Sequence, residues 1–204
     1  MIRTWITTSW RNFLKYKSFS IINICGLSLG IACVIAILLY ILDEVSYDRF
    51  HEKAERIYQV NSISAYDGSS NRYATTSTPL ADAIRSDVPE VEEAARLFGR
   101  QATIQVIEAD STLSADKKYF EDNFYFADPS ILNIFSFTFL SGDRKNPLVN
   151  PNQIILTEKI AVKYFGAVEA AVGKQLLFEG TIPLEVSAVV ADHPEQSTHR
   201  IELL

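Results

Sequence analysis

Residues 21–42, IINICGLSLGIACVIAILLYIL, form the feature that most limits what this chain can fold into. The 22 residues contain no charged side chain, and thirteen of them are Ile, Leu or Val. As a helix the segment would be about 33 Å long, which matches the roughly 30 Å of bilayer hydrocarbon. Each aliphatic residue favours insertion by roughly 0.3 to 0.6 kcal/mol, and the sum outweighs the cost of Asn23 and Ser28. The segment therefore predicts a transmembrane helix.

Two alternatives to a membrane span are a cleaved signal peptide and a buried helix of a soluble protein. The apolar core of a signal peptide is usually about 7 to 15 residues long, and it precedes a small-x-small cleavage site. Here the apolar run is longer, and it ends in LYILDEVSYD, which contains no such site. Buried core helices are usually shorter than this segment. Both alternatives are therefore less favoured than a retained membrane anchor.

The distribution of charge predicts how the helix crosses the membrane. Residues 1–42 contain four basic residues and no acidic residue. Residues 43–204 contain 15 basic residues and all 25 acidic residues, which gives this part a formal net charge of −10. Basic residues before a span favour a cytoplasmic N-terminus, so residues after about 43 are expected on the non-cytoplasmic side of the membrane. The acidic body has no Lys/Arg cluster that would bind nucleic acid.

Residues 1–20 are expected to form a cytoplasmic or interfacial amphipathic segment. Apolar residues recur at helical spacing and include Trp5 and Trp10, while polar residues fill the opposite face. This pattern suits a helix that lies in the membrane interface, and the interfacial anchor is predicted to consist of Trp5, Trp10, Arg11, Lys15 and Lys17. The alternative is a plain cytoplasmic tail whose cations only set the orientation of the span.

Gly26 and Gly30 form a G-x-x-x-G pattern within the predicted membrane helix. Small residues at this spacing let a second helix approach closely, so both glycines are predicted to lie at a helix-packing site. The alternative is that glycine is simply common in membrane helices. Cys25 and Cys33 also lie in this segment, about 12 Å apart on a helix, which is too far for a disulfide.

The body, residues 43–204, predicts a mixed α/β domain of the α+β class. The polar sequence from Asp43 to Tyr58 is expected to extend the membrane helix. Strands are expected over 57–63, 91–108, around 116–120, 153–156, 175–178 and 184–190, a loop over 67–72 and a turn at 141–143. A helix opened by Thr78-Pro79 is expected to carry Leu80, Ala83, Ile84 and Val88 along one face and to end at Pro89. A short helix passing into a strand is expected near 131–137, and a helix over 157–165 is expected to be capped by Thr157 and stopped by Gly166.

No catalytic, cofactor-binding or metal site is predicted. Gly166 and Gly173-Lys174 resemble a phosphate-binding loop only superficially, because the glycines are too far apart and Gln175 stands where Ser or Thr should be. The histidines do not have metal-ligand spacing, since Pro194 interrupts the segment that holds Asp192, His193, Glu195 and His199. That segment is interpreted as a solvated loop, and His51 as a surface residue. With no nucleophile motif either, an enzyme is the weaker class.

Several stretches in order resemble one family of membrane proteins. The first is WRNFLKYKSFSIINICGLSLGIACVIAILLYILDEVSYDRFHEKAERIYQV, followed by TSTPLADAIRSDVPEVEEAARL, YFADPSILNIFSFTFLSGD, IILTEKIAVKYFG and VGKQLLFEG with LEVSAVVADHPEQS. Together they resemble bacterial ABC-transporter permeases of the FtsX-like, MacB-like type, with a MacB-like periplasmic core domain over residues 43–204.

The resemblance implies partners that the residues themselves do not reveal. Permeases of this type work with a cytoplasmic ABC ATPase, which binds the ATP, and with a second permease copy or half in the membrane lipid. Some also engage a periplasmic adaptor and an outer-membrane channel. The membrane helices carry the movement of the ATPase to the periplasmic domains, which drive efflux or related export.

The expected function is therefore a permease subunit, present as an N-terminal fragment, of a mechanotransmission ABC transporter. The sequence departs from the family pattern because no second hydrophobic span precedes Leu204. The core domain is accordingly expected to be incomplete at its C-terminus. The alternative function is a membrane-tethered extracytoplasmic sensor or ligand-binding module.

Overall fold

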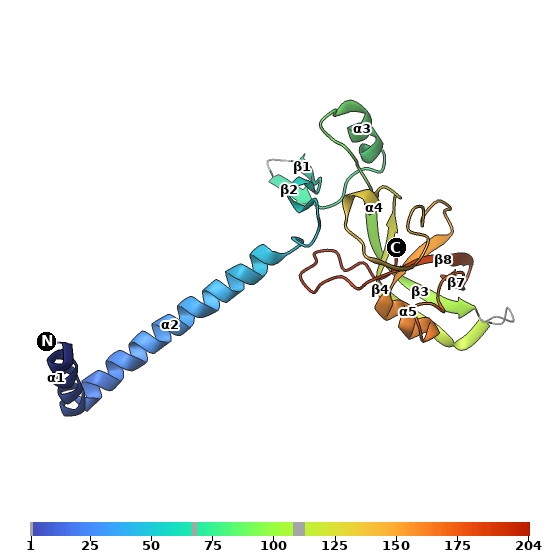
Figure 1. Cartoon of the computed structure of the whole chain (residues 1–204). Helices are drawn as coiled ribbons and strands as arrows, with labels where there is room; N and C mark the ends of the chain where they lie inside the picture. The colour runs from blue at the N-terminus through green and yellow to red at the C-terminus, as the bar shows by residue number, and fades with distance from the viewer. Residues whose placement is uncertain (1, 67–68, 108–112) are drawn as a thin grey trace. The chain divides into compact units, whose positions relative to one another are not determined.

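The computed structural model describes residues 2–66, 69–107 and 113–204 (Figure 1). The chain divides into two compact units, one ending at Tyr47 and the other comprising Asp48–Leu204. The first unit holds helix α1, Ile2–Lys15, and helix α2, Lys17–Ser46. The second unit holds every strand and the remaining helices.

Helix α2 contains the predicted membrane segment. Its 30 residues correspond to a length of about 45 Å, and none of them is buried within the protein. In the described part of the chain it is the one helix that is long and apolar enough to cross a bilayer. Exposure of so large an apolar surface to water is unfavourable, and contact with the hydrocarbon of a lipid bilayer removes that cost.

The predicted extension of this helix to Tyr58 is wrong. Helix α2 ends at Ser46, and Asp48 has a φ of 57° in the left-handed region, which no continuing helix tolerates. A short 3-10 helix, η1, follows at Ala54–Arg56. The predicted strand over 57–63 is also mostly wrong, because the first strand, β1, is Ser62–Tyr66.

A small hairpin and a helix come before the main sheet. Strand β1 pairs antiparallel with β2, Ser69–Tyr73, so most of the predicted loop at 67–72 is strand, while residues 67–68 lie outside the described residues. Helix α3 is Leu80–Asp87, one residue later than predicted, with Pro79 at its N-cap. Ala81 is its buried residue. Of the four residues expected along one face, Leu80 and Ile84 are partly buried, and Ala83 and Val88 are exposed.

The main sheet has six strands: β3 (Leu97–Ile107), β4 (Leu113–Ala127), β5 (Phe139–Gly142), β6 (Gln153–Thr157), β7 (Gln175–Phe178) and β8 (Ile182–Val190). Their order is β4-β3-β7-β8-β5, and β6 pairs in parallel with β8. The remaining helices are α4, Ile131–Ile134, and α5, Glu158–Phe165. This mixture confirms the predicted fold class. The predicted strand over 91–108 begins only at Leu97, and Glu108 lies outside the described residues.

The last residues of the chain close the sheet on itself. Leu203 bridges Phe124 of β4 on one side and Leu156 of β6 on the other. The amide of Tyr125 donates to the carbonyl of Leu203 at 2.8 Å, and Leu204 and Ile155 exchange two backbone hydrogen bonds at 2.8 and 3.0 Å. Hydrogen-bonded neighbours therefore run in a ring from β4 through β3, β7, β8 and β6 to residues 203–204 and back to β4.

The apolar core lies against this ring. Its largest fully buried side chains include Ile104, Leu156, Leu176, Val186 and Leu203. Each such side chain stabilises the fold by about 1.5 to 3 kcal/mol relative to exposure. Helix α5 begins after Thr157 and ends at Gly166, with φ 82°, as predicted. The prediction that Thr157 caps this helix through its side chain is wrong, because its buried hydroxyl makes no capping hydrogen bond.

A buried carboxylate ties α5 to the sheet. Glu121 of β4 is 5% exposed and accepts hydrogen bonds from Lys163 Nζ at 2.6 Å and Tyr164 Oη at 2.8 Å. The ring of Tyr119 stacks on that of Tyr164 at 4.6 Å, and burial raises the pKa of the Tyr164 hydroxyl above its ordinary value. Because both donors come from one helix, the carboxylate fixes the orientation of α5.

Candidate functional site

The first candidate site is the junction segment, Asp48–Arg56, which follows the membrane helix after Tyr47. Its first residue makes three hydrogen bonds to the loop at residues 192–199. The Asp48 amide donates to the Gln196 carbonyl at 2.9 Å. One carboxylate oxygen accepts the Thr198 amide at 2.9 Å, and the other accepts the Thr198 hydroxyl. The segment that leaves the membrane helix is thus fastened to the core domain at its first residue.

The next contacts attach the junction segment to α4 and to the connection between α4 and β5. The Ser136 amide donates to His51 Nδ1 at 3.1 Å, and the Glu52 amide donates to the Ser136 hydroxyl at 2.9 Å. Lys53 Nζ donates to the Asn133 carbonyl at 2.9 Å. Because Nδ1 of His51 accepts a hydrogen bond, the neutral ring carries its proton on Nε2.

All three histidines of the chain meet beside these contacts. His51 stacks on Phe135 with 4.7 Å between ring centroids and lies 4.0 Å from Phe50. His193 lies 5.4 Å from Phe137, and His199 lies 6.4 Å from Phe135. We refer to His51, His193, His199, Phe50, Phe135 and Phe137 as the histidine cluster.

The histidine cluster corrects two predictions. His51 was expected at the surface but is 7% exposed, because it packs under residues from two distant segments. The segment with His193 and His199 was expected to be a solvated loop, yet both rings are half-buried and Ser197 is buried. Burial lowers the pKa of His51 below its ordinary value, with His199 adding to the effect and Asp48 opposing it. Burial also lowers the pKa of His193, and its Nε2 has no hydrogen-bond partner among the described residues.

The chemistry that the geometry of this cluster supports is proton binding. Across residues 2–66, 69–107 and 113–204, no group of three or more His, Cys, Asp or Glu side chains is arranged to hold a metal ion. His51 Nδ1 is already occupied by the Ser136 amide. At His51, which is buried against Phe135, an added proton would place a positive charge with little contact with water.

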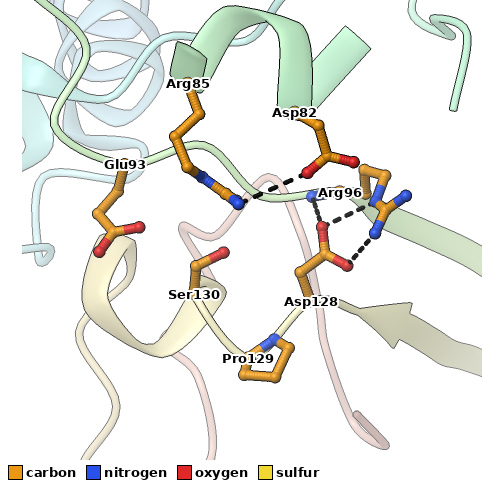
Figure 2. A pocket seen from close by; sticks show the side chains of 7 residues that line it. All are labelled: Asp82, Arg85, Glu93, Arg96, Asp128, Pro129 and Ser130. Carbon is orange, nitrogen blue, oxygen red and sulfur yellow. Dashed lines mark hydrogen bonds and ion pairs between the residues drawn. The ribbon is translucent and has the colours of Figure 1, made fainter. Parts of the chain in front are cut away.

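A second candidate is a charged pocket of about 340 Å³ near α3 and α4. Figure 2 shows its lining residues, Asp82, Arg85, Glu93, Arg96, Asp128, Pro129 and Ser130. Arg85 Nη1 lies 3.5 Å from the Asp82 carboxylate, and Arg85 Nη2 donates to the Ala94 carbonyl. These contacts attach α3 to the segment before β3.

The strongest pair in this pocket joins Arg96 and Asp128. The guanidinium donates twice to the carboxylate, at 2.8 and 2.7 Å, and the Arg96 amide donates to it at 2.9 Å (Figure 2). The hydrogen bonds from Arg96 lower the pKa of Asp128 below its ordinary value. Since both guanidinium groups of the pocket already face carboxylates, we interpret it as a structural clamp rather than a ligand site.

The residues predicted as sites lie in the first unit. Gly26 and Gly30 lie one turn apart on α2, and a Cβ atom built at either position meets no other atom within 4 Å. Trp5 and Trp10 on α1 are 76% and 63% exposed, and Arg11, Lys15 and Lys17 are exposed as well. Helix packing and interfacial anchoring stay predictions for these residues. The sequence did not point to Asp48, Ser136 or Thr198, whose role depends on contacts between distant segments.

Comparison with known families settles the class of the chain. The model of the MacB-like periplasmic core domain family matches residues 20–201. The chain belongs to this family. A crystal structure of a domain assigned to a permease from Porphyromonas gingivalis has the same fold, with a TM-score of 0.55 and 21% sequence identity. That similarity covers 67% of this chain, and the chain spans 54% of the length of that structure.

None of the curated proteins compared with the chain matches it. Membership of the MacB-like periplasmic core domain family confirms the resemblance seen in the sequence, and it places the chain among permease components rather than among typical enzyme families. The apolar helix α2 together with a core domain of the periplasmic type makes this a membrane-anchored protein.

Proposed function

We propose that this chain is the N-terminal part of a permease subunit of a mechanotransmission ABC transporter. It carries the movement of a cytoplasmic ATPase across the inner membrane for efflux or related export. The single observation that carries the proposal is the attachment of Asp48 to Gln196 and Thr198. Two residues after helix α2 ends, the backbone is already bound to the core domain. A displacement of the helix end would therefore pull on the 192–199 loop instead of being absorbed by a flexible linker.

The expected partners follow from the family. They are a cytoplasmic ABC ATPase that binds ATP, a second permease copy or half, and membrane lipid, with a periplasmic adaptor and an outer-membrane channel in an efflux system. The cations at Arg11, Lys15 and Lys17 support a cytoplasmic N-terminus, with the core domain in the periplasm. The alternative, an extracytoplasmic ligand-binding module, gains little from the pocket in Figure 2, since its guanidinium groups already pair with carboxylates.

The test uses the natural membrane protein that contains this chain, purified from its host with an affinity tag and reconstituted in nanodiscs. We expect an ABC ATPase to copurify. We also expect addition of ATP to change the amide exchange of residues 48–56 and 192–199. The Asp48→Ala variant should retain the ATPase but lose the ATP-dependent change in the 192–199 loop. The matched control Glu90→Ala removes an exposed carboxylate from the same domain and should respond like the wild type.

Absence of any copurifying ATPase would refute the permease assignment. An Asp48→Ala variant that keeps the full ATP-dependent change would refute transmission through this contact while leaving the assignment intact. Orientation has its own test in spheroplasts. External protease should digest residues after about 43, and complete protection of the acidic domain would overturn the proposed topology.

A further inference from the structure

The histidine cluster lies where three chain segments meet. His51 comes from the junction segment, Phe135 and Phe137 come from the connection between α4 and β5, and His193 and His199 come from the loop after β8. The same loop accepts the contacts of Asp48 through Gln196 and Thr198. Any change in the charge of His51 therefore acts at the attachment of the junction segment.

His51 is held in a form that a proton would disrupt. The Ser136 amide donates a hydrogen bond to Nδ1. If Nδ1 took up a proton, two N–H donors would face each other and the hydrogen bond would be lost. The ring is 7% exposed and stacks on Phe135, which leaves an added charge with little solvation.

The charged and titratable groups around His51 come from each neighbouring segment. Asp48, on its own segment, favours a positive charge on His51, but its carboxylate already accepts two hydrogen bonds from Thr198. His199 on the facing loop disfavours that charge. His193 interacts with His51 as a like charge, and Asp192 partly offsets the effect on His193. On β4, Tyr125 lies 6.4 Å from His199 and its hydroxyl is neutral, because burial raises its pKa.

We propose that His51 is a pH-sensitive latch: a proton taken from solvent onto Nδ1 at mildly acidic pH releases the junction segment from Ser136 and from the loop at residues 192–199. This regulation goes beyond the proposed transport function and does not depend on it, because it follows from contacts within Asp48–Leu204. A periplasmic domain exposed to the medium would thereby be uncoupled from its membrane helix when the surroundings become acidic.

The direction of the effect follows from proton linkage. The pKa of folded His51 lies below its ordinary value of 6.5, so the released state binds the proton more readily. The latch is therefore fully stable above about pH 6.5, and it weakens as the pH falls from there towards the lower pKa of the folded state. Below the folded pKa the loss is complete and constant.

The first test measures amide hydrogen exchange of the full chain in nanodiscs at about pH 7.5 and about pH 5, with rates corrected for intrinsic exchange. In the wild type, protection of residues 48–56 should fall by about tenfold for each pH unit between 6.5 and the folded pKa, while residues 153–165 stay protected. His51→Asn keeps an acceptor oxygen near the Nδ1 position without titrating, so its protection should not change with pH. His193→Gln should keep the fall.

The second test does not rely on a variant that folds. Since the chain has only three histidines, their ring nitrogens can be followed individually by NMR of the isotope-labelled wild type. His51 should show an unprotonated Nδ1 at neutral pH and titrate below 6.5, together with the amide of Ser136. The proposal is overturned if His51 titrates at or above 6.5, if His51→Asn shows the same loss of protection as the wild type, or if His193→Gln abolishes that loss.

Discussion

Asp48 and Thr198 are separated by 150 positions in the sequence, yet two hydrogen bonds join the carboxylate of one to the amide and hydroxyl of the other. Asp48 is the second residue after helix α2, and it also has the positive φ of 57° that redirects the chain. Asp tolerates this backbone conformation better than most residues do. One residue therefore combines a left-handed backbone with the contacts that attach the junction segment to the core domain.

Replacing Asp48 with alanine should destabilise the core domain by about 1.5 to 3 kcal/mol, since two hydrogen bonds to a charged group are lost and the positive φ suits alanine poorly. Asp48→Asn should lose less, because it keeps one acceptor and tolerates the backbone. Thermal unfolding of the purified chain measures both. Glu90→Ala is the control. If Asp48→Ala had the same midpoint of thermal unfolding as the control, the contact between Asp48 and Thr198 would not stabilise the domain.

Glu121→Ala should destabilise the domain by about 1 to 3 kcal/mol, because it leaves the hydroxyl of the buried Tyr164 without its acceptor. Glu121→Gln keeps an acceptor and should cost less. The free energy of unfolding is measured by chemical denaturation, followed by far-ultraviolet circular dichroism. Glu185→Gln changes an exposed carboxylate on β8 and serves as the matched control for Glu121→Gln, with a stability close to that of the wild type. If Glu121→Gln and Glu185→Gln lost the same free energy of unfolding, the burial of Glu121 would not matter.

Gly142→Ala and Gly173→Ala separate backbone strain from steric clash. Both glycines have positive φ, 91° and 77°, so each substitution costs about 1 kcal/mol or more from strain. Of the two positions, only at Gly142 would the new Cβ also clash, with the Ser187 carbonyl oxygen and with Ala188. We expect Gly142→Ala to lower the melting temperature clearly more than Gly173→Ala. Equal effects would show that β5 can move away from β8.

The Arg96–Asp128 pair should make the domain sensitive to acid. The pKa of Asp128 is lowered below its ordinary value of 3.8, so its contribution to stability is present above about pH 4 and is lost as the pH falls through the folded pKa. In Asp128→Asn the slope of stability against pH should be shallower below pH 4, with little change in slope near neutrality. Acid titration of unfolding free energy measures this. If the slope of Asp128→Asn equalled that of the wild type, the Arg96–Asp128 pair would not contribute to the acid sensitivity of the domain.

Gly26→Leu with Gly30→Leu should weaken association of α2 with another membrane helix, because the bulkier side chains prevent close approach. Both positions are open on the isolated helix, so the helix itself should form as before. A membrane two-hybrid assay measures the association. Replacing Leu27 and Leu29 with isoleucine keeps the apolar character and serves as the control, and unchanged association of the double glycine variant would exclude this packing site.

Elements with strong local signals were predicted well from the sequence. The uncharged run at 21–42 lies within α2, and the strand followed by Thr157 and a helix ending at Gly166 is found as β6 and α5. In each case hydrophobic length or a glycine with left-handed backbone decides the structure within a few residues. Such signals do not depend on what the rest of the chain does.

The elements that were missed depend on distant contacts. Asp43 to Tyr58 has a composition that suits a helix, yet the hydrogen bonds of Asp48 and His51 to residues near 136 and 198 hold the chain in turns instead. The polar stretch Ser69–Arg72 resembles a loop but gains strand pairing from β1. The burial of His51 had only a weak local signal, the aromatic neighbour Phe50, since its cover comes from Phe135 and the C-terminal loop.

The closure of the sheet by residues 203–204 makes two strands depend on a segment that follows both of them in the sequence. Leu203 is the bridging partner of both Phe124 in β4 and Leu156 in β6. Because synthesis runs from the N-terminus, the ring can close only after residue 203 has been made. Until then β4 and β6 keep unpaired edges, through which an incompletely folded domain could pair with other chains.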